Sequence, residues 1–458
     1  MKNLKDIIYA KSPHFIQNGI VSIFNILAYK ERYSGKYKEY KNRYFNNKDL
    51  TLGELITVQS QKYKELIHYT MENSKYYKKT LNTVEIPDSL DRIDELPIMD
   101  KETLRKNIDE VYTIKKEDGH TAKTGGTTGK SLEVIYTSSD VQERFAILDN
   151  FRSGFGYKLG KKTAWFSGKN LLNSKDIKKN RFWKTDYFYN VRYYSTFHIH
   201  SKYLDFYLKN LISYKPEYMV GFPSTMYEIA KYGINNQIIF PSNIIKAIFP
   251  TAETITPDIR NVIEGYFKTN IYNQYASSEG APFILECVNK NLHLELQSGV
   301  FEVLNSENKP SRKGRLVVTS FNTHGTPLIR YDIGDQIELQ DGCCSCGNNN
   351  PLVKEISGRV SDYIFSEEIG KINLGNISNC LKGVQGIVKF QIQQDSIKQL
   401  LVLIEKDDNV FSIKDEQTFL KNLRDRVGEK IGVEINYVNQ IPVEKSGKFR
   451  LVKNNLKK

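Results

Sequence analysis

The spacing of apolar residues divides the chain into a helical first part, an alternating middle part and a short final part. In residues 1–120, apolar and aromatic side chains recur every three or four positions, as in Ser60–Leu81, which is typical of helices. From residue 160 to 340, short apolar runs alternate with helical segments, which indicates an α/β fold. After Gly358 and Arg359 the pattern changes to strands with one helix, which predicts a small α+β domain.

Several elements can be placed by residue number. Asp100 is a predicted N-cap for a helix that begins near Lys101. Leu132–Thr137 alternates as a strand directly after a glycine-rich loop, which predicts a hairpin around that loop. The other predicted strands are Thr163–Phe166, Tyr218–Gly221, Ala247–Pro250, Asn270–Tyr275, Gly314–Phe321, Leu328–Tyr331, Asp335–Leu339, Gly386–Gln394, Gln399–Glu405 and Gly432–Val438. The other predicted helices are Tyr203–Ser213, Ser224–Tyr232 and Glu416–Gly428.

Length and composition describe a soluble globular protein. The 458 residues are too many for one ordinary core, so we expect two or three domains. The net charge of +13 comes from 66 basic and 53 acidic residues, and the lysines are scattered. Because no nucleic-acid motif accompanies this charge, we expect no nucleic-acid partner. A lysine-rich solvated surface is the favoured interpretation, and attraction to anionic substrates, lipid or glycan is the alternative.

Gly19–Tyr29 is the most apolar segment near the N-terminus. It contains Ser22 and Asn25 and is shorter than the about 20 residues that span a bilayer. We favour packing of this segment on the protein's own core over a helix that lies on a membrane surface. The N-terminus lacks the pattern of a signal peptide, so we expect a cytoplasmic location. Peripheral membrane association and a homodimer both stay open.

A glycine- and threonine-rich loop, Thr124–Ser131, is the strongest candidate for binding phosphate. Its three glycines let the backbone approach a ligand, and its threonines and Lys130 supply donors. The Walker motif requires a glycine five residues before Gly129, and Thr124 stands there instead. The loop therefore predicts phosphate binding in a fold other than that of P-loop enzymes.

Four further segments carry side chains that suit a nucleotide. Tyr275–Glu279 combines an aromatic ring, which can lie on a purine, with a carboxylate that can hold Mg²⁺. Arg330–Asp335 places an acid after a predicted glycine turn, where it can accept ribose hydroxyls. Ser357–Asp362 lies at the predicted domain boundary. Pro442–Lys448 places a lysine on a glycine turn near the C-terminus.

The order and spacing of these segments resemble the adenylate-forming superfamily of acyl-CoA synthetases, luciferases and adenylation domains. Within it they look most like the branch of phenylacetate–CoA ligase and the adenylating proteins of capsular polysaccharide biosynthesis. Leu96–Arg105, Val220–Thr225 and Pro327–Tyr331 also look like that branch. The resemblance covers nearly the whole chain. It implies an α/β adenylating domain at 1–358, including the helical region and a small β subdomain, a hinge at 359–362 and a small mobile α+β lid domain at 363–458.

The resemblance also implies an activity. A carboxylate would attack the α-phosphate of ATP to give an acyl-adenylate and pyrophosphate, and the acyl group would then pass to CoA or to a glycan or amine acceptor of a surface polysaccharide. ATP and Mg²⁺, and CoA as one of the acceptors, are the expected cofactors. Positioned cations would stabilise the charge that builds up on phosphorus. A lysine is needed only for the first step, which suits a domain that moves.

Each matching residue receives an implied role. Asp335 would hold the ribose hydroxyls, and Arg359 would make a second nucleotide contact. Glu279 would bind Mg²⁺, Lys448 would bridge the reacting carboxylate and the α-phosphate, and Thr128 would act with them in catalysis. The implied phosphate loop is Thr124, Gly125, Gly126, Thr127, Thr128, Gly129 and Lys130, and the implied residues around the adenine are Ala252, Glu253, Asn273, Tyr275 and Ser278.

Two positions depart from the family pattern. Many members carry a hinge acid where this chain has Ser361, which puts the usual domain rotation in doubt. Ala276 stands where glycine is usual, which narrows the backbone's freedom. Ser361 gives slight support to the alternative of a non-enzymatic glycan- or membrane-binding homologue, which Glu279, Asp335 and Lys448 argue against. A P-loop kinase or NTPase is disfavoured by the loop spacing.

Four of the five cysteines fall in two short segments. Cys287, His293, Cys344 and Cys346 form a set suited to tetrahedral zinc, and no ligand position would stay open, so we expect a structural ion. Ordinary reduced cysteines are the alternative, and Cys343 could replace Cys344 as a ligand. Some members of the branch named above resemble this chain in carrying such a site. Cys380 is expected in a core.

Overall fold

The computed structural model describes residues 9, 12–81, 89–123, 132–169, 171–199, 201–359, 363–368, 370–373, 377, 379–381, 383–442 and 449–456. The predicted phosphate loop Thr124–Ser131, the lysine Lys448 and the hinge positions Ser361 and Asp362 lie outside these residues. Unit 1 comprises Met1–Ser22, Gly160–Ile271 and Ser357–Lys458, and unit 2 comprises Ile23–Leu159 and Tyr272–Ile356. Each unit has its own sheets and its own cores.

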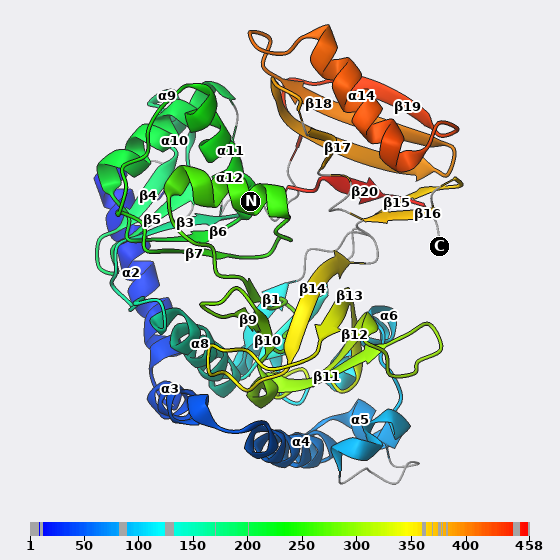
Figure 1. Ribbon diagram of the computed structural model, residues 1–458. Coiled ribbons are helices and arrows are strands. Elements are labelled where there is room, and N and C mark those ends of the chain that lie inside the picture. The colour runs from blue at the N-terminus through cyan, green and yellow to red at the C-terminus, as the bar shows by residue number, and fades with distance from the viewer. Residues whose placement is uncertain are drawn as a thin grey trace. The chain divides into compact units, whose positions relative to one another are not determined.

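The first part of unit 1 is built on a five-stranded sheet with the order β4-β5-β3-β6-β7. Strands β5, β3, β6 and β7 are parallel, and β4 runs antiparallel at one edge. All four residues of β6 and of β7 are buried, as expected for parallel strands covered on both faces. Helices α10, α11 and α12 pack beside one another over this sheet (Figure 1). The elements are β3 (Thr163–Ser167), α9 (Ser174–Lys178), β4 (Trp183–Asp186), β5 (Val191–Ser195), α10 (Ser201–Tyr214), β6 (Tyr218–Gly221), α11 (Pro223–Asn235), β7 (Ala247–Pro250) and α12 (Pro257–Phe267).

The C-terminal part of unit 1 has a separate four-stranded sheet with the order β19-β18-β17-β20. Helix α14 lies across one face of it (Figure 1), and Phe419, Leu423 and Val427 of that helix are buried in the core beneath. Cys380 is buried in the same core, as predicted. The elements are β15 (Tyr363–Ser366), β16 (Gly370–Asn373), β17 (Ile387–Ser396), β18 (Gln399–Lys406), α14 (Ile413–Val427), β19 (Gly432–Tyr437) and β20 (Val452–Asn454).

Unit 2 combines helices with a seven-stranded sheet of order β11-β12-β13-β14-β10-β9-β8. Its core joins apolar residues of α4 and α5 to those of the sheet. Its helices are α3 (Tyr37–Asn46), α4 (Leu52–Asn73), α5 (Lys75–Leu81), α6 (Lys101–Lys106), α7 (Ile108–Val111) and α8 (Ser138–Ser153). Its strands are β1 (His120–Lys123), β2 (Glu133–Tyr136), β8 (Gln274–Tyr275), β9 (Ile284–Glu286), β10 (Leu292–Leu294), β11 (Gly299–Leu304), β12 (Lys313–Ser320), β13 (Tyr331–Gln340) and β14 (Leu352–Arg359).

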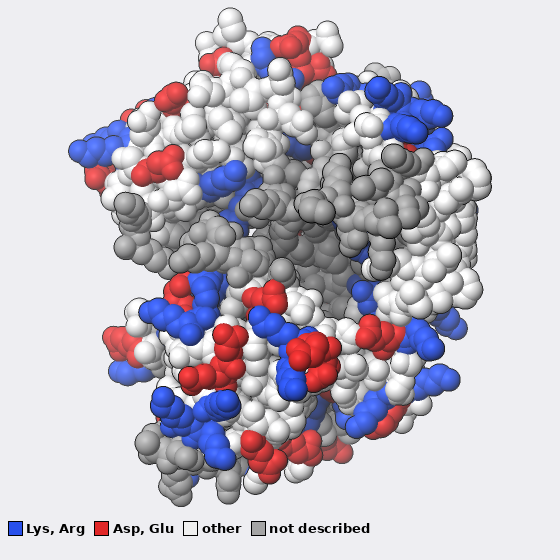
Figure 2. Space-filling model, turned by 180° about the vertical axis from the view of Figure 1, so that it is seen from behind, with Lys and Arg blue, Asp and Glu red and all other residues white. Residues whose placement is uncertain are grey.

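Four predicted elements differ from the structure, and one of them is the strand Leu328–Tyr331, of which only Tyr331 lies in a strand, the first residue of β13. The helical pattern at Ser60–Leu81 is two helices, because Ser74 has extended backbone angles and ends α4. The predicted strand Asn270–Tyr275 is reduced to β8, which contains only Gln274 and Tyr275. The predicted turn at Gly334 is wrong, since β13 runs through it as one strand. The lysines do lie scattered, and basic and acidic side chains are mixed over the face that Figure 2 presents.

Helix α2 (His14–Tyr33) contains the apolar segment singled out above. The expectation that this segment packs its apolar residues on the core is only partly met. Val21 and Tyr29 are buried, whereas Ile23, Phe24 and Leu27 are exposed. Within the part of the chain that the structure describes, no helix combines the length and apolarity needed to cross a bilayer.

Candidate nucleotide and metal sites

The predicted nucleotide residues are divided between the two units. Asn273, Tyr275, Ser278, Glu279 and Asp335 belong to unit 2. Ala252 and Glu253 belong to unit 1, as does Arg359, the last residue of β14. The two antiparallel strands that flank the glycine-rich loop pair as predicted, with Lys123 opposite Glu133, while the loop itself lies outside the described residues.

Tyr275 and Asp335 are brought into direct contact in unit 2. The Tyr275 hydroxyl donates to Asp335 Oδ2 at 2.5 Å. A β-bulge in β13 sets the direction of Asp335, because Arg315 and Val317 of β12 pair with Gln336 and Asp332. Gly334 lies within this bulge at φ +81°, an angle that suits glycine. The prediction that Gly334 has a special backbone conformation is confirmed, but this glycine bends a continuous strand instead of forming a turn.

Glu279 is buried and forms an ion pair that no local sequence pattern predicts. Lys101 Nζ lies 2.8 Å from Glu279 Oε1, although the two residues are 178 positions apart. Lys101 is the first residue of α6, and the predicted N-cap Asp100 accepts from Thr103 N–H at 2.7 Å. The N-cap therefore fixes the start of the helix that carries Lys101 to the carboxylate. The carboxylate's charge is thus balanced by a lysine in this structure.

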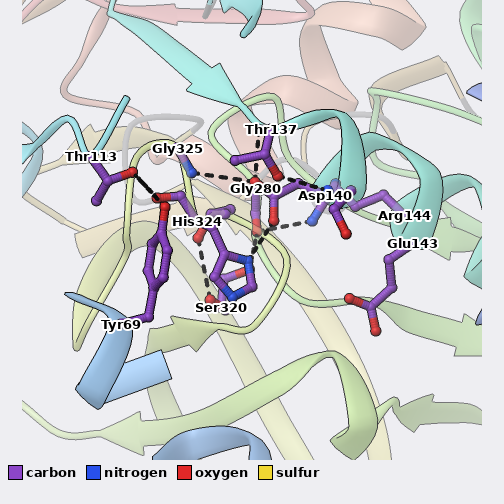
Figure 3. A network of polar contacts seen from close by, with 12 residues as sticks. Tyr69, Thr113, Thr137, Asp140, Glu143, Arg144, Gly280, Ser320, His324 and Gly325 are labelled. Carbon is purple, nitrogen blue, oxygen red and sulfur yellow. Dashed lines mark hydrogen bonds and ion pairs between the residues drawn. The ribbon is translucent and has the colours of Figure 1, made fainter. Parts of the chain in front are cut away.

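A tight turn, Ser277–Gly280, fixes the backbone around Glu279. Ser277 Oγ accepts from the backbone N–H groups of Gly280 and Ala281 at 3.2 and 3.0 Å. The Gly280 carbonyl accepts from Ser320 Oγ at 2.6 Å and from Arg144 Nη1 at 3.0 Å, as Figure 3 shows. Gly280 has φ +107°, which residues with a Cβ rarely adopt.

The same network holds the start of α8, the helix that follows the glycine-rich loop and β2. Thr137 and Asp140 form a capping box, and the Asp140 carboxylate also lies 2.7 Å from His324 Nδ1 (Figure 3). Burial alone would raise the pKa of Asp140, but the hydrogen bond and charge of His324 outweigh it and lower that pKa. Burial alone would lower the pKa of His324, and Asp140 raises it instead. Both shifts favour the charged form of the pair.

Glu253 is tied to the start of α11 in unit 1. Its carboxylate accepts from Ser224 N–H at 2.9 Å and from Ser224 Oγ at 3.0 Å. A carboxylate at a helix N-terminus is favoured by the helix dipole. Ala252, just before it, has φ +67° although it is not a glycine. This backbone angle and the helix cap together fix the course of the chain after β7.

The four residues predicted to bind zinc are gathered in unit 2. One ligand atom each of Cys287, His293, Cys344 and Cys346 lies within 4.8 Å of all the others. Cys287 follows β9 and His293 lies on β10, while the other two come from the loop between β13 and β14. Cys343 is exposed and stands outside this group, so the structure selects Cys344 over it.

The distances in this group fit one tetrahedral ion. Zinc–sulfur bonds of about 2.3 Å place two thiolates about 3.8 Å apart on a tetrahedron, and a thiolate and an imidazole nitrogen about 3.6 Å apart. Cys287 Sγ and Cys344 Sγ are 3.7 Å apart, and Cys346 Sγ and His293 Nε2 are 3.6 Å apart. The other ring nitrogen of His293 lies 3.1 Å from the Asn350 carbonyl, which leaves Nε2 free to bind a metal.

Solved structures with known functions show which fold this is. A 2-hydroxyisobutyryl-CoA ligase in complex with an acyl-AMP aligns with a TM-score of 0.71 over 89% of this chain and 91% of that one, at 16% identity. A GH3.15 acyl acid amido synthetase aligns with a TM-score of 0.54 over 84% of this chain and 87% of that one, at 14% identity. The fold is therefore that of adenylate-forming enzymes, with the expected C-terminal domain.

Sequence comparison identifies the family within this fold. The family described as the CapK C-terminal domain matches residues 364–455. Protein CapK of Staphylococcus aureus is 33% identical over 460 aligned positions, which cover 98% of this chain and 99% of that protein. An identity of this size over both full lengths indicates common descent with a shared fold. The chain therefore belongs to the CapK family.

Proposed function

We propose that this protein uses ATP to activate a carboxylate as an acyl-adenylate, with release of pyrophosphate. The observation that carries the proposal is the contact between Tyr275 of β8 and Asp335 of β13 in the adenylate-forming fold. An aromatic ring held by a carboxylate suits a purine nucleoside, because the ring can stack on the base while the acid accepts from the ribose hydroxyls.

Charge placement supports the same chemistry. Glu279 would hold Mg²⁺, which shields the phosphates when bound, and Lys101 balances that carboxylate in the structure described here. On binding of the metal, Lys101 would be released toward the phosphates or the incoming carboxylate. Lys448 would approach the α-phosphate from the C-terminal domain, with 363–458 as the moving lid and 359–362 as its hinge. The bond that breaks would be the one between the α- and β-phosphates.

The proposed acceptors of the acyl group are CoA and an amine or hydroxyl of a surface glycan. Of the solved structures that share this fold, one is named a CoA ligase and another an acyl acid amido synthetase, which supports a thiol or an amine as the acceptor here. A carboxylate panel scored by pyrophosphate release, with and without CoA, would identify both substrates.

Exchange of labelled pyrophosphate into ATP tests the first step directly. We expect carboxylate-dependent exchange in the wild type, none in Lys448→Ala, and a raised KM for ATP in Asp335→Ala. Lys398→Ala is the matched control, because Lys398 is an exposed lysine of the same C-terminal region in the turn between β17 and β18. A wild-type protein that binds ATP but exchanges with no acid of a broad panel would refute the proposal.

We also propose that Cys287, His293, Cys344 and Cys346 bind one structural zinc ion. The ion would join the β9–β10 hairpin to the loop between β13 and β14, which are far apart in sequence. Elemental analysis should give about one zinc per chain, and Cys344→Ser should lose it while Cys343→Ser keeps it. Metal-free protein that stays folded and active would contradict this proposal without affecting the one above.

A further inference from the structure

Helix α2 packs with its polar face inward and its apolar face outward. The inward residues Gln17, Asn18, Ser22 and Asn25 are buried although all are polar. The outward face carries Phe15, Ile16, Ile23, Phe24 and Leu27. A surface helix of a globular protein normally has the opposite arrangement, so this one requires a physical reason.

The reason for the inward polar face is the edge strand β4. Asn18 Oδ1 accepts from Thr185 N–H at 3.1 Å, and Ser22 Oγ accepts from Tyr187 N–H at 2.9 Å. Asn18 Nδ2 also donates to the Tyr187 hydroxyl at 2.9 Å. The helix thereby covers an exposed strand edge, which would otherwise present unpaired backbone donors. These bonds fix which face of α2 is directed outward.

The outward face is broad as well as apolar. Ile23, Phe24 and Leu27 are 62%, 67% and 65% exposed. Phe15 and Phe24 are nine positions apart, so at about 100° per residue the apolar face spans about 180° of the helix. The turn Tyr187–Phe188, which lies beside Asn18 and Ser22, adds two more exposed aromatic side chains. An area of this kind on a soluble protein marks an interaction surface.

Apart from Glu31, which pairs with His120 near the end of α2, the charges around this face are basic. No acidic residue occurs between Asp6 and Glu31 in the sequence. Helix α9 is tied to the start of α2 by Asp176, which lies 3.3 Å from His14 Nδ1 and 2.7 Å from the buried Lys184 Nζ. Because Asp176 is buried, the exposed charges of α9 and the residue after it are those of Lys175, Lys178 and Lys179. In Figure 2 the edge that carries α2 shows a wide area without charged side chains, with Lys and Arg gathered above it.

We propose that the outward face of α2, with Tyr187 and Phe188, docks this protein on an anionic lipid bilayer. A broad convex apolar face flanked by lysines matches a helix that lies in the plane of a membrane interface. A second copy of the chain is the less favoured occupant, because it would bring the same lysines face to face on two proteins of net charge +13. A coiled-coil seam would also be narrower than this face. Bound in this way, the enzyme would work at a membrane surface, whatever its substrates are.

Co-flotation of the full-length protein with vesicles tests this docking. The vesicles are phosphatidylcholine alone and phosphatidylcholine mixed with phosphatidylglycerol in equal parts. We expect flotation with the anionic vesicles, weaker flotation with the neutral ones, and loss of binding at high salt. Ile23→Glu should lower the partition coefficient by about tenfold or more, since it removes one buried aliphatic side chain and adds a negative charge. The matched control is Ile239→Glu, at an isoleucine of the same protein that is 77% exposed in a loop outside α2.

The results of this experiment distinguish a lipid bilayer from a second copy of the chain as the partner of the outward face of α2. Wild-type protein that stays unbound to anionic vesicles, or equal flotation of Ile23→Glu and wild type, would overturn the proposal. Light scattering on the same samples gives the oligomeric state. A wild-type dimer that Ile23→Glu converts to monomer, without flotation, would assign the face to a second copy and refute the bilayer. Because both variants lie at exposed positions, circular dichroism should show that both remain folded.

Discussion

Replacement of Gly280 by alanine should destabilise unit 2, because two separate features of the structure exclude a Cβ there. An added Cβ would lie 2.2 Å from Thr323 Cγ2 and 3.0 Å from the Tyr136 hydroxyl. Overpacking of this kind costs about 1–3 kcal/mol. The backbone angle of φ +107° costs about 1–3 kcal/mol more for a residue other than glycine. We therefore expect Gly280→Ala to lower the free energy of unfolding by about 2–6 kcal/mol.

A second substitution separates the two costs. Thr323→Ser removes the methyl group that clashes and keeps the hydroxyl, which donates to the Ser320 carbonyl at 3.2 Å. Alone, this change should cost about 1 kcal/mol for the lost buried methyl. In the Gly280→Ala background it should cost nothing or restore stability, which gives a coupling energy of about 1–3 kcal/mol. The part of the destabilisation that comes from the positive φ angle at residue 280 should remain in the double variant.

The assay is urea unfolding followed by circular dichroism, with calorimetry to assign the transition that belongs to unit 2. Gly53→Ala is the control within the same unit, because a Cβ at Gly53 in α4 would meet nothing within 4 Å, and it should stabilise by up to about 1 kcal/mol. Gly280→Ala should also raise the Mg²⁺ concentration needed for ATP use, since Glu279 precedes it. Equal stability of Gly280→Ala and wild type, or no coupling with Thr323→Ser, would refute the reasoning.

Two further predictions concern buried charges. Arg330→Met should lower the free energy of unfolding by about 3–5 kcal/mol, because it leaves the carboxylate of Glu302, now 2.6 Å from Arg330 Nη2, without its partner; an unchanged urea midpoint would contradict this. Burial raises the pKa of Glu228 from 4.5 to about 7, so the folded protein holds a proton that the unfolded chain has lost between these values. Wild-type stability should therefore fall as pH rises from about 4.5 through 7, and Glu228→Gln should flatten that part of the stability profile by up to about 3 kcal/mol. Parallel profiles of the two proteins would show that Glu228 is charged in the folded state.

Strands that are continuous apolar runs could be predicted to the residue. Tyr218–Gly221 and Ala247–Pro250 are β6 and β7 with the predicted bounds, because buried parallel strands need no polar face. Strand β4 could not be predicted, because its sequence, Trp-Lys-Thr-Asp, is mostly polar and is typical of a loop. Its last three residues are nevertheless buried, with Lys184 and Asp186 among them. Lys184 tolerates burial because it pairs with Asp176 and hydrogen-bonds to His14 and Gln17, and the last two, which lie 170 and 167 positions away, could not be predicted from any local pattern.

In the candidate site, too, residues that belong to local sequence patterns could be predicted, and residues that depend on distant contacts could not. Tyr275, Glu279 and Asp335 could be singled out because each ends a recognisable local pattern. Lys101 could not be singled out, since its role depends on meeting Glu279 across 178 positions of sequence. Gly334 was recognised as conformationally special, but glycine at positive φ serves a turn and a β-bulge equally well. Only the pairing of β12 with β13 decides between them, and pairing is a property of the folded chain.

Helix α2 shows why an amphipathic pattern does not by itself tell which face is buried. The periodicity of Gly19–Tyr29 defines a polar face and an apolar face, and the usual preference directs the apolar face inward. Here the helix lies against an edge strand whose outward N–H groups require partners, although Val21 also packs on Val191 and Tyr193. Asn18 and Ser22 can satisfy those groups and aliphatic side chains cannot. The N–H groups at this sheet edge therefore determine that the polar face of α2 is buried. The apolar face is left exposed, and this is the face that we propose docks on an anionic membrane.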